Sequence, residues 1–236
     1  MARRLFFVDG VHSGRAEIAG DTARHLTRVL RVEAGQKYEI SDNSSLYLAE
    51  VETARKEHVV FRVLEKLDPR PSGPPITLCA ALIKFERFEW MIEKATELGV
   101  ARILPVMAER SEKGLDRGAF KRLERWRRIA LESSQQCRRP HLPEILEPSS
   151  VALAVQTAAE LRLLLDESGV GRPILEAARP AASAAVLVGP EGGWTDGERE
   201  LTVRAGWTPV TLGHNILRAE TATLAALAVM GCALRG

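Results

Sequence analysis

The sequence predicts an α/β protein in which a small β-rich domain precedes a larger domain of alternating strands and helices. The chain has 236 residues, enough for one large domain or two unequal ones. Residues 68–75 hold four of the twelve prolines and indicate a linker, because proline removes backbone donors and restrains its neighbours. At this point the hydrophobic pattern changes from short strands to strand–helix alternation.

The segment before the linker, residues 1–72, is expected to form a β-barrel-like domain. Short runs of strand-forming residues are separated by turn signals such as Gly35 and Asp42-Asn43. Residues 21–32 are the exception, because their apolar side chains recur at helical spacing beside a row of basic ones. The strands are expected at residues 4–8, 37–41, 46–51 and 59–67.

Residues 73–236 are expected to form a parallel sheet covered by helices. An apolar run at 76–83 precedes a helical repeat that Gly99 ends, and a second strand follows at 100–106. This order is that of a βαβ unit. Thr195 and Glu198 have the spacing of a capping box. The later strands are expected at 161–165, 185–188 and 209–212, and the later helices at 118–136, 196–205 and 219–234.

Charge is unevenly distributed along the chain. The formal net charge is only +2, but residues 110–141 carry ten basic and four acidic residues, whereas residues 142–236 carry seven and eleven. A local excess of this size favours a partner with a phosphate backbone.

The centre of the basic segment is expected to be an amphipathic helix with basic side chains facing outward. A solvated basic face is the simpler interpretation of this helix alone. It accounts less well for the charge that continues into Arg138 and Arg139, for which phosphate contact is the natural use. The buried face is expected to consist of Phe120, Leu123, Trp126, Ile129 and Ala130.

Several classes of protein are disfavoured by the composition. The three cysteines are far apart and form no Cys-x-x-Cys pair, which suits a reducing cytosol. The five histidines neither cluster nor pair with cysteines at ligand spacing, so we expect no metal. The longest apolar run, residues 222–234, falls short of the ~20 residues that span a bilayer. We therefore expect a cytoplasmic protein without a membrane partner.

Two glycine-containing loops follow predicted strands in the last third of the chain. Residues 189–193, Gly-Pro-Glu-Gly-Gly, lead into a capped helix, and Gly213 begins a second loop before the last helix. Ligands of parallel sheets bind outside the carboxyl ends of the strands, where glycine allows close backbone approach. A tight strand-to-helix turn is the alternative for either loop alone. Arg218 and Glu220 suit charge stabilisation and proton handling, although a solvated flank and a helix-dipole contact would also explain them.

Four motifs resemble the ribosomal small-subunit methyltransferase E family. They are Lys94-Ala-Thr-Glu-Leu-Gly-Val100, Glu132-Ser-Ser-Gln-Gln-Cys-Arg138, Val188-Gly-Pro-Glu-Gly-Gly193 and Leu212-Gly-His-Asn-Ile-Leu-Arg-Ala-Glu-Thr-Ala222. The segment His25-Leu-Thr-Arg-Val-Leu-Arg31 resembles the family's N-terminal domain. The match follows the family's order over essentially the whole chain.

The resemblance implies a PUA-like N-terminal β-barrel, residues 1–72, followed by a SPOUT-type α/β domain, residues 73–236, with a C-terminal trefoil knot. It implies a homodimer that transfers a methyl group from S-adenosylmethionine to N3 of a uridine in 16S ribosomal RNA, free or within the 30S subunit.

The resemblance also implies roles for individual residues. Arg218 would stabilise the negative charge that develops on uridine, and Glu220 would handle the N3 proton. The cofactor would lie among Leu165, Leu187, Val188, Gly189, Pro190, Glu191, Gly192, Gly193, Leu212, Gly213, Ile216 and Leu217. RNA would contact Arg4, Arg24, Arg28, Arg31, Arg138, Arg139 and Asn215.

Two features depart from the family's pattern. Asn215 stands where an arginine is usual, and the turn at 42–47 lacks the glycines expected there. Two other functions stay open on the sequence alone: a SPOUT methyltransferase that acts on transfer RNA or another RNA, and a non-catalytic RNA-binding protein.

Overall fold

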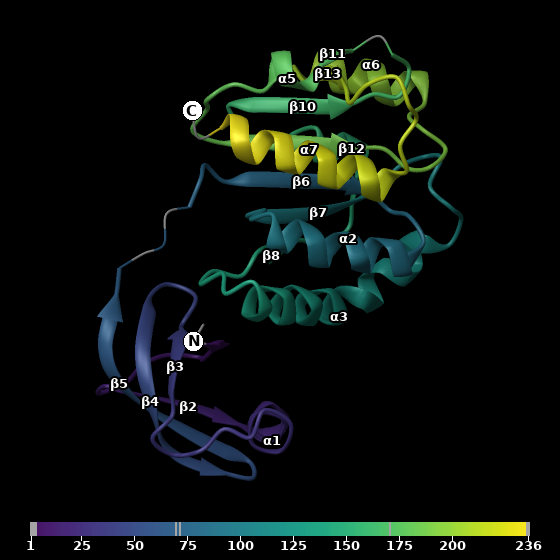
Figure 1. The fold of residues 1–236 in the computed structure, drawn as a ribbon. Helices are drawn as coiled ribbons and strands as arrows, with labels where there is room; N and C mark the ends of the chain where they lie inside the picture. The colour runs from purple at the N-terminus through teal and green to yellow at the C-terminus, as the bar shows by residue number, and fades with distance from the viewer. Residues whose placement is uncertain (1–3, 69, 71, 170, 235–236) are drawn as a thin grey trace. The chain divides into compact units, whose positions relative to one another are not determined.

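The computed structural model describes residues 4–68, 70, 72–169 and 171–234 (Figure 1). The chain divides into two compact units. The first unit consists of Met1–Pro71 and Ser134–Leu142, and the second consists of Ser72–Ser133 and Pro143–Gly236. The sequence predicted a single change of domain at the proline-rich segment, so the return of residues 134–142 to the first unit is a difference from that prediction.

The first unit is a mixed five-stranded sheet with one helix. Its strand order is β1-β3-β4-β5-β2, in which β1 runs parallel to β3 and the other pairs are antiparallel. Two register shifts between β4 and β5 mark bulges, which bend long strands. The sheet ends at β1 and β2 and is therefore a half-barrel instead of the predicted barrel. The elements are β1 (Leu5–Phe7), β2 (Arg15–Ala19), α1 (Gly20–Arg28), β3 (Lys37–Ser41), β4 (Leu46–Arg55) and β5 (His58–Leu67).

Residues 134–142 belong to the first unit because polar contacts tie them to its sheet. Arg138 Nη2 donates to the buried Glu39 carboxylate at 2.8 Å, and Arg70 donates to the same carboxylate. The Ser41 hydroxyl donates to the Pro140 carbonyl at 2.6 Å. Arg70, within the predicted linker at residues 68–75, is therefore bound to the first unit, while Pro69 and Pro71 of that segment lie outside the described residues.

The second unit contains a parallel sheet with strand order β11-β13-β10-β12-β6-β7-β8, and β9 pairs with β7. The elements that follow the first unit along the chain are β6 (Ile76–Ala81), α2 (Phe85–Glu97), β7 (Arg102–Met107), α3 (Leu115–Gln136), β8 (Glu144–Ile145), β9 (Ser149–Ser150), α4 (Val151–Ala154), β10 (Leu161–Leu165), β11 (Arg172–Pro173), α5 (Ile174–Ala177), β12 (Ala184–Val188), α6 (Asp196–Arg204), β13 (Thr208–Thr211) and α7 (Ala219–Ala233).

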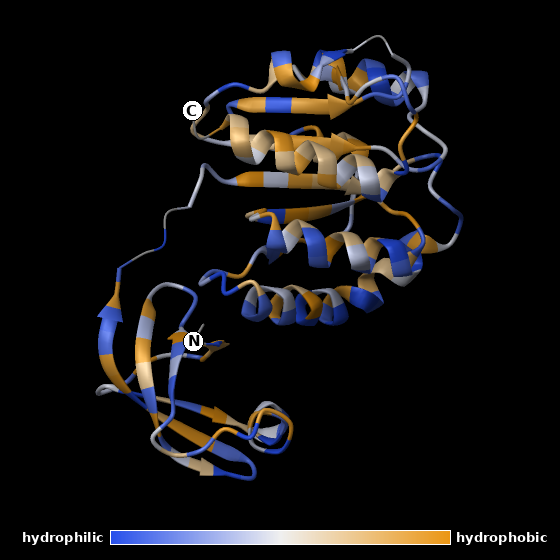
Figure 2. Cartoon of the chain, in the orientation of Figure 1, coloured by the Kyte–Doolittle hydropathy of each residue, from blue (hydrophilic) through white to orange (hydrophobic). Residues whose placement is uncertain are grey.

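Apolar residues cover both faces of this sheet, which Figure 2 shows as orange strands. One core joins the sheet to α2, α3, α5 and α7 and includes Phe88, Trp126 and Met230. The other core lies on the opposite face and includes α4, Trp194 and Trp207. Because side chains alternate along a strand, β6, β7, β10 and β12 each contribute residues to both cores.

Several local predictions are confirmed. Thr195 and Glu198 form the reciprocal capping box of α6, and Gly99 ends α2 with φ +88°. One prediction about α3 is wrong: Phe120 is 48% exposed, and Ala119 is buried in its place. The buried face of α3 begins at Leu115 and continues through Ala119, so Phe120, one residue later, lies beside this face and not on it. Within the described residues, no helix is long and apolar enough to cross a membrane.

Candidate functional site

A cavity of about 910 Å³ lies at the carboxyl end of the parallel sheet of the second unit. The central strand here is β10, which pairs with β12 on one side and with β13 on the other. The connection from β12 to β13 therefore passes over β10, which lies between these two strands in the sheet. Such a switch point opens a crevice between the loops that follow the strands, which is where ligands of parallel sheets bind.

Both glycine-containing loops line this cavity. The structure brings together all the predicted cofactor-site residues except Leu187 and Gly192, and it adds Asn215 and Arg218 to them. Leu187 points to the other core, because its neighbour Val188 faces the cavity and side chains alternate along a strand. Gly192 lies against the side chain of Arg110. The lining residues that the sequence did not predict are Asp166, Glu167, Gly169, Gly171, Pro173, Ile174, Leu175, Val210, Thr211, His214, Ala219 and Ala222.

Two acidic side chains follow β10 at one end of the cavity and share an arginine of α6. Arg199 Nε donates to Asp166 at 3.1 Å, and Arg199 also pairs with Glu167. Burial acts to lower the pKa of Arg199, but the hydrogen bond to Asp166 and the nearby carboxylates outweigh it, so the pKa is raised. Arg199 therefore stays charged, and it holds both carboxylates at the cavity edge.

The loop at residues 189–193 depends on glycine at two positions. Gly193 has φ +69°, and a Cβ added there would collide with the Glu167 carboxylate. A Cβ on Gly189 would lie 2.9 Å from Trp194 Nε1, which donates to the Leu165 carbonyl at 3.1 Å. From outside the loop, Arg110 Nη1 donates to the carbonyls of Gly192 and Trp194 at 3.3 and 3.2 Å. The loop is thus held from both sides in one conformation.

Arg218 and Glu220 begin α7 and have different environments. Arg218 is the N-cap residue, is exposed and lines the cavity. Glu220 is 8% exposed, and its Oε2 atom has no hydrogen-bond partner in the described part of the chain. Its ion-pair partner is Arg87 of α2, whose Nε lies 3.9 Å from Glu220 Oε1. Arg87 also donates to Glu191 of the glycine loop. Arg87 could not be selected from the sequence. Its helix α2 lies beside this loop only because β6 pairs with β12, and the sequence alone does not give the strand order.

The basic residues predicted to contact RNA are not all equally available. Arg4, Arg24, Arg28 and Arg31 are exposed on the first unit, and Arg24 pairs there with Asp21 and Glu57. Arg138 is paired with the buried Glu39, and burial lowers the pKa of Arg139. On α3 the outward basic side chains include Lys121 and Arg128, whereas Arg122 and Arg125 pair with Glu89 of α2.

Comparison with known proteins agrees with this architecture. Residues 70–231 match the family model described as RNA methyltransferase domain, and residues 18–64 match the model described as RNA methyltransferase PUA domain. A ribosomal RNA small subunit methyltransferase E from Synechocystis is 34% identical over 89% of this chain and 70% of its own length. The chain belongs to this family. Another member, from Mycobacterium bovis, is 33% identical over 98% of this chain and 92% of its own length.

Two solved structures are similar to this chain over nearly its whole length. The ribosomal RNA small subunit methyltransferase E of Neisseria gonorrhoeae, bound to S-adenosylmethionine, superposes with a TM-score of 0.89 at 28% identity, covering 98% of each chain. The Legionella pneumophila protein Lpg2936, solved with bound cofactor SAM, gives a TM-score of 0.90 at 29% identity and covers 99% of this chain and 98% of its own. Both units of the chain are therefore of the family's type.

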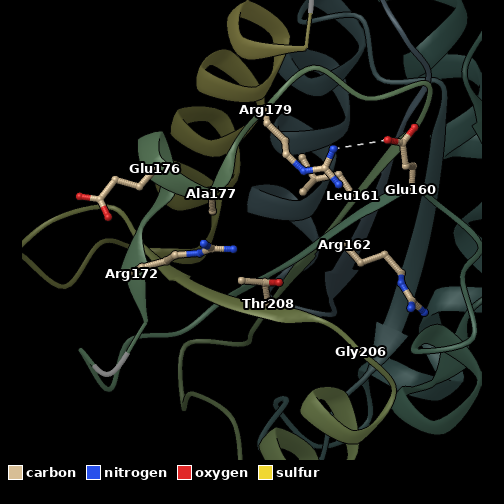
Figure 3. Close-up of a pocket in the computed structure, with 9 residues that line it drawn as sticks. All are labelled: Glu160, Leu161, Arg162, Arg172, Glu176, Ala177, Arg179, Gly206 and Thr208. Atoms are coloured by element: carbon tan, nitrogen blue, oxygen red, sulfur yellow. Dashed lines mark hydrogen bonds and ion pairs between the residues drawn. The ribbon is translucent and has the colours of Figure 1, made fainter.

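A second cavity, of about 260 Å³, lies at the opposite ends of β10 and β13 (Figure 3). Arg162, Arg172 and Arg179 line it together with Glu160 and Glu176. Arg179 pairs with Glu160, which also accepts from the Ala182 amide at 2.7 Å. The charges of Arg179 and Glu160 offset each other, and none of the family-type loop residues lines this cavity.

No cluster of three or more histidine, cysteine or carboxylate side chains suited to a metal ion occurs among the residues that the structure describes.

Proposed function

We propose that the protein is an S-adenosylmethionine-dependent methyltransferase that methylates N3 of a uridine in 16S ribosomal RNA. One observation carries this proposal: two glycine-containing loops meet across β10 at a cavity that Arg218 also lines. Glu220 does not line the cavity but is buried next to Ala219, which does. Family membership and the cofactor-bound relative from Neisseria gonorrhoeae support the cofactor and the ribosomal RNA substrate. The N3 atom is the finer part of the proposal and comes from the family resemblance.

The residues that line the cavity fit S-adenosylmethionine. Leu165, Val188, Leu212 and other aliphatic side chains suit the adenine ring, and the loop at 189–193 supplies backbone groups that can approach it closely. The Asp166 and Glu167 carboxylates are suited to accept hydrogen bonds from ribose hydroxyls or the amino group. A volume of about 910 Å³ also leaves room for a base beside the cofactor.

The remaining work falls to the chain's own side chains. The bound cofactor supplies an electrophilic methyl group, whereas uridine N3 is a poor nucleophile until its proton leaves. Arg218 is placed to stabilise the resulting negative charge, and the positive end of the α7 dipole acts in the same direction. Glu220 has an oxygen without a partner among the described residues and is the candidate for the proton. Asn215 can hydrogen-bond the base edge.

RNA docking is proposed for the PUA-like domain, residues 1–72, with methyl transfer in residues 73–236. Arg4, Arg28 and Arg31 are the preferred candidates for phosphate contact, because these residues are exposed; Arg24 is exposed too, but it pairs with Asp21 and Glu57. Arg138 is less suited than the sequence suggested, since its charge is neutralised by Glu39. Arg139 stays a candidate within the same segment.

A homodimer and a trefoil knot complete the proposal. Helix α7 is apolar on nearly every side, and Ala225, Ala228 and Cys232 recur on a face that is exposed or half-buried in the single chain, which suits contact with a second copy. The crossing of the chain over β10, followed by the return of α7 to pack on α2, is compatible with a threaded C-terminal segment. Light scattering would test the dimer. The site of action is proposed to be the cytoplasm, where the small subunit is assembled.

Two measurements separate this function from the alternatives. Calorimetry with S-adenosylmethionine should show binding, and its absence would favour a non-catalytic RNA-binding protein. Incubation with methyl-labelled cofactor and, separately, 30S subunits, free 16S RNA or transfer RNA should label ribosomal RNA. Label confined to transfer RNA would contradict the proposed substrate.

A further inference from the structure

Arg87 lies between two carboxylates that belong to different parts of the site. Its Nη1 donates to Glu191 in the glycine loop after β12, and its Nε lies 3.9 Å from Glu220 at the start of α7. Glu191 has a side chain that is 45% exposed, whereas the Glu220 side chain is only 11% exposed. One guanidinium group therefore connects a surface loop to a buried acid.

The strand order explains why this contact exists. β6 pairs with β12, so the beginning of α2, which follows β6, lies at the same edge of the sheet as the loop after β12. Helix α7 packs on α2 along its length. Arg87 sits in the first turn of α2, where it can reach both neighbours.

The environment of Glu220 makes Arg87 more than a surface ion pair. A buried carboxylate is costly unless it is paired, and Glu220 leaves one oxygen without a partner among the described residues. β12 has no ionisable side chain, and Glu176, the acid of α5, lines the cavity at the other end of the sheet. Arg218 is exposed at the cavity. Within the described chain, Arg87 is thus the cation that forms an ion pair with Glu220.

We infer that Arg87 is a positioning residue that couples the cofactor-binding loop to Glu220. This inference rests on the proposed function. The guanidinium fork can engage two carboxylates at once, which a lysine ammonium on its flexible stem does less well. By holding Glu191, Arg87 keeps the glycine loop against the cavity, and by facing Glu220 it fixes the carboxylate proposed to take the proton. A displacement of Glu191 therefore changes the position of Glu220, and a displacement of Glu220 changes that of Glu191.

The test uses the full-length protein with S-adenosylmethionine in calorimetry and 16S RNA in single-turnover methyl transfer. For Arg87→Met we expect the Kd of the cofactor to rise about tenfold, and the transfer rate at saturating cofactor to fall by at least about tenfold. Arg87→Lys should partly restore either the Kd of the cofactor or the transfer rate, but not both. A role in folding alone would leave the saturated rate unchanged once the variant is folded.

A double-mutant cycle tests the coupling itself. Glu191→Gln should weaken cofactor binding severalfold, and adding it to Arg87→Met should cause little further loss, because both changes break the same contact. Arg102→Met is the matched control: Arg102 pairs with Glu144 at 3.4 Å on exposed β-strand residues, and its loss should leave the Kd unchanged.

Three results would overturn the inference. They are a wild-type Kd of the cofactor in Arg87→Met, a Kd in the double variant that rises by the product of the two single effects, and wild-type Kd and transfer rate in Arg87→Lys. Glu191 is exposed, so Glu191→Gln keeps the test decisive if Arg87→Met does not fold, and an unchanged Kd in that variant would also contradict the coupling. Failure of the wild-type protein to bind the cofactor is a different outcome, because it would remove the proposed function as a whole.

Discussion

The two ends of the parallel sheet differ in a way that shows what makes a site in this fold. Both ends of β10 and β13 are hollow. At the amino end, Arg162, Arg172 and Arg179 share about 260 Å³ with two glutamates. At the carboxyl end, about 910 Å³ is lined mainly by glycine loops and aliphatic side chains. The proposed catalytic site is at the carboxyl end, where charged side chains make up the smaller share of the lining.

One difference between the two ends is the burial and pairing of a carboxylate. At the amino end, Glu160 is already engaged by Arg179 and by a backbone amide. At the carboxyl end, Glu220 is buried with one oxygen that has no partner among the described residues, and Arg218 faces the cavity. A buried oxygen without a partner is destabilising, which makes Glu220 a candidate for a role in the reaction. Mutations at matched positions of the two ends can test this contrast.

The largest expected effect is that of Arg218→Ala. Removing the group that faces the developing charge should lower kcat by about a hundredfold to a thousandfold while changing the Kd of the cofactor little. The counterpart at the amino end, Arg172→Ala, should leave both constants unchanged. Steady-state methyl transfer and calorimetry on the two variants would measure this, and equal activity of the two variants would break the contrast.

A smaller but still severe effect is expected for Gly193→Ala. The added Cβ would meet the Glu167 carboxylate, and alanine disfavours φ +69°, so cofactor affinity should fall by at least about tenfold. Gly197 in the neighbouring helix α6 is the control, because a Cβ there meets no atom within 4 Å. Gly197→Ala should keep the affinity and raise the free energy of unfolding by up to about 1 kcal/mol. A wild-type Kd for Gly193→Ala would contradict the proposed role of the loop.

The sequence predicts this loop well because its signals are local. A buried apolar strand, three glycines and a Thr195–Glu198 capping box lie next to one another in the chain, and the structure contains the strand, the turn and the cap. The same holds for β10, whose bounds match the apolar run at 161–165. Buried parallel strands are continuous apolar runs, which require no knowledge of their neighbours.

Features that depend on long-range pairing could not be predicted in this way. Strand β2 is interrupted by charged residues and is defined by its antiparallel pairing with β5, and the two-residue β11 is defined by its pairing with β13. Arg87 reaches the site only because β6 lies beside β12. Leu187 does not line the cavity, because alternation turns its side chain to the other core. Its contact with the cofactor stays a prediction.

Two buried tryptophans provide an intermediate test of the two ends. Trp194 Nε1 donates to Leu165 at the carboxyl end, and Trp207 Nε1 donates to Val155 just before β13. Replacing either by phenylalanine leaves a buried carbonyl without its donor and should lower the free energy of unfolding by about 1–3 kcal/mol. Only Trp194→Phe should also weaken cofactor binding. Chemical denaturation with calorimetry would show this, and equal effects on binding would mean that the loop is not specifically supported by Trp194.

The smallest effect is expected for Arg179→Ala. Its ion pair with Glu160 is formed by side chains that are 60% and 46% exposed, so its loss should change stability by less than about 1 kcal/mol. Methyl transfer should be unaffected. A large loss of activity would show that the amino-end cavity takes part in the reaction and would remove the contrast between the two ends.

The central claim is that the carboxyl-end cavity transfers a methyl group to a uridine N3 of 16S RNA. The most direct test is to incubate the protein with methyl-labelled S-adenosylmethionine and 16S RNA or 30S subunits, digest the RNA to nucleosides and identify the labelled product. The predicted result is label in 3-methyluridine alone, formed about a hundredfold to a thousandfold more slowly by Arg218→Ala. Label in another nucleoside, or no label with a protein that binds the cofactor, would contradict the claim.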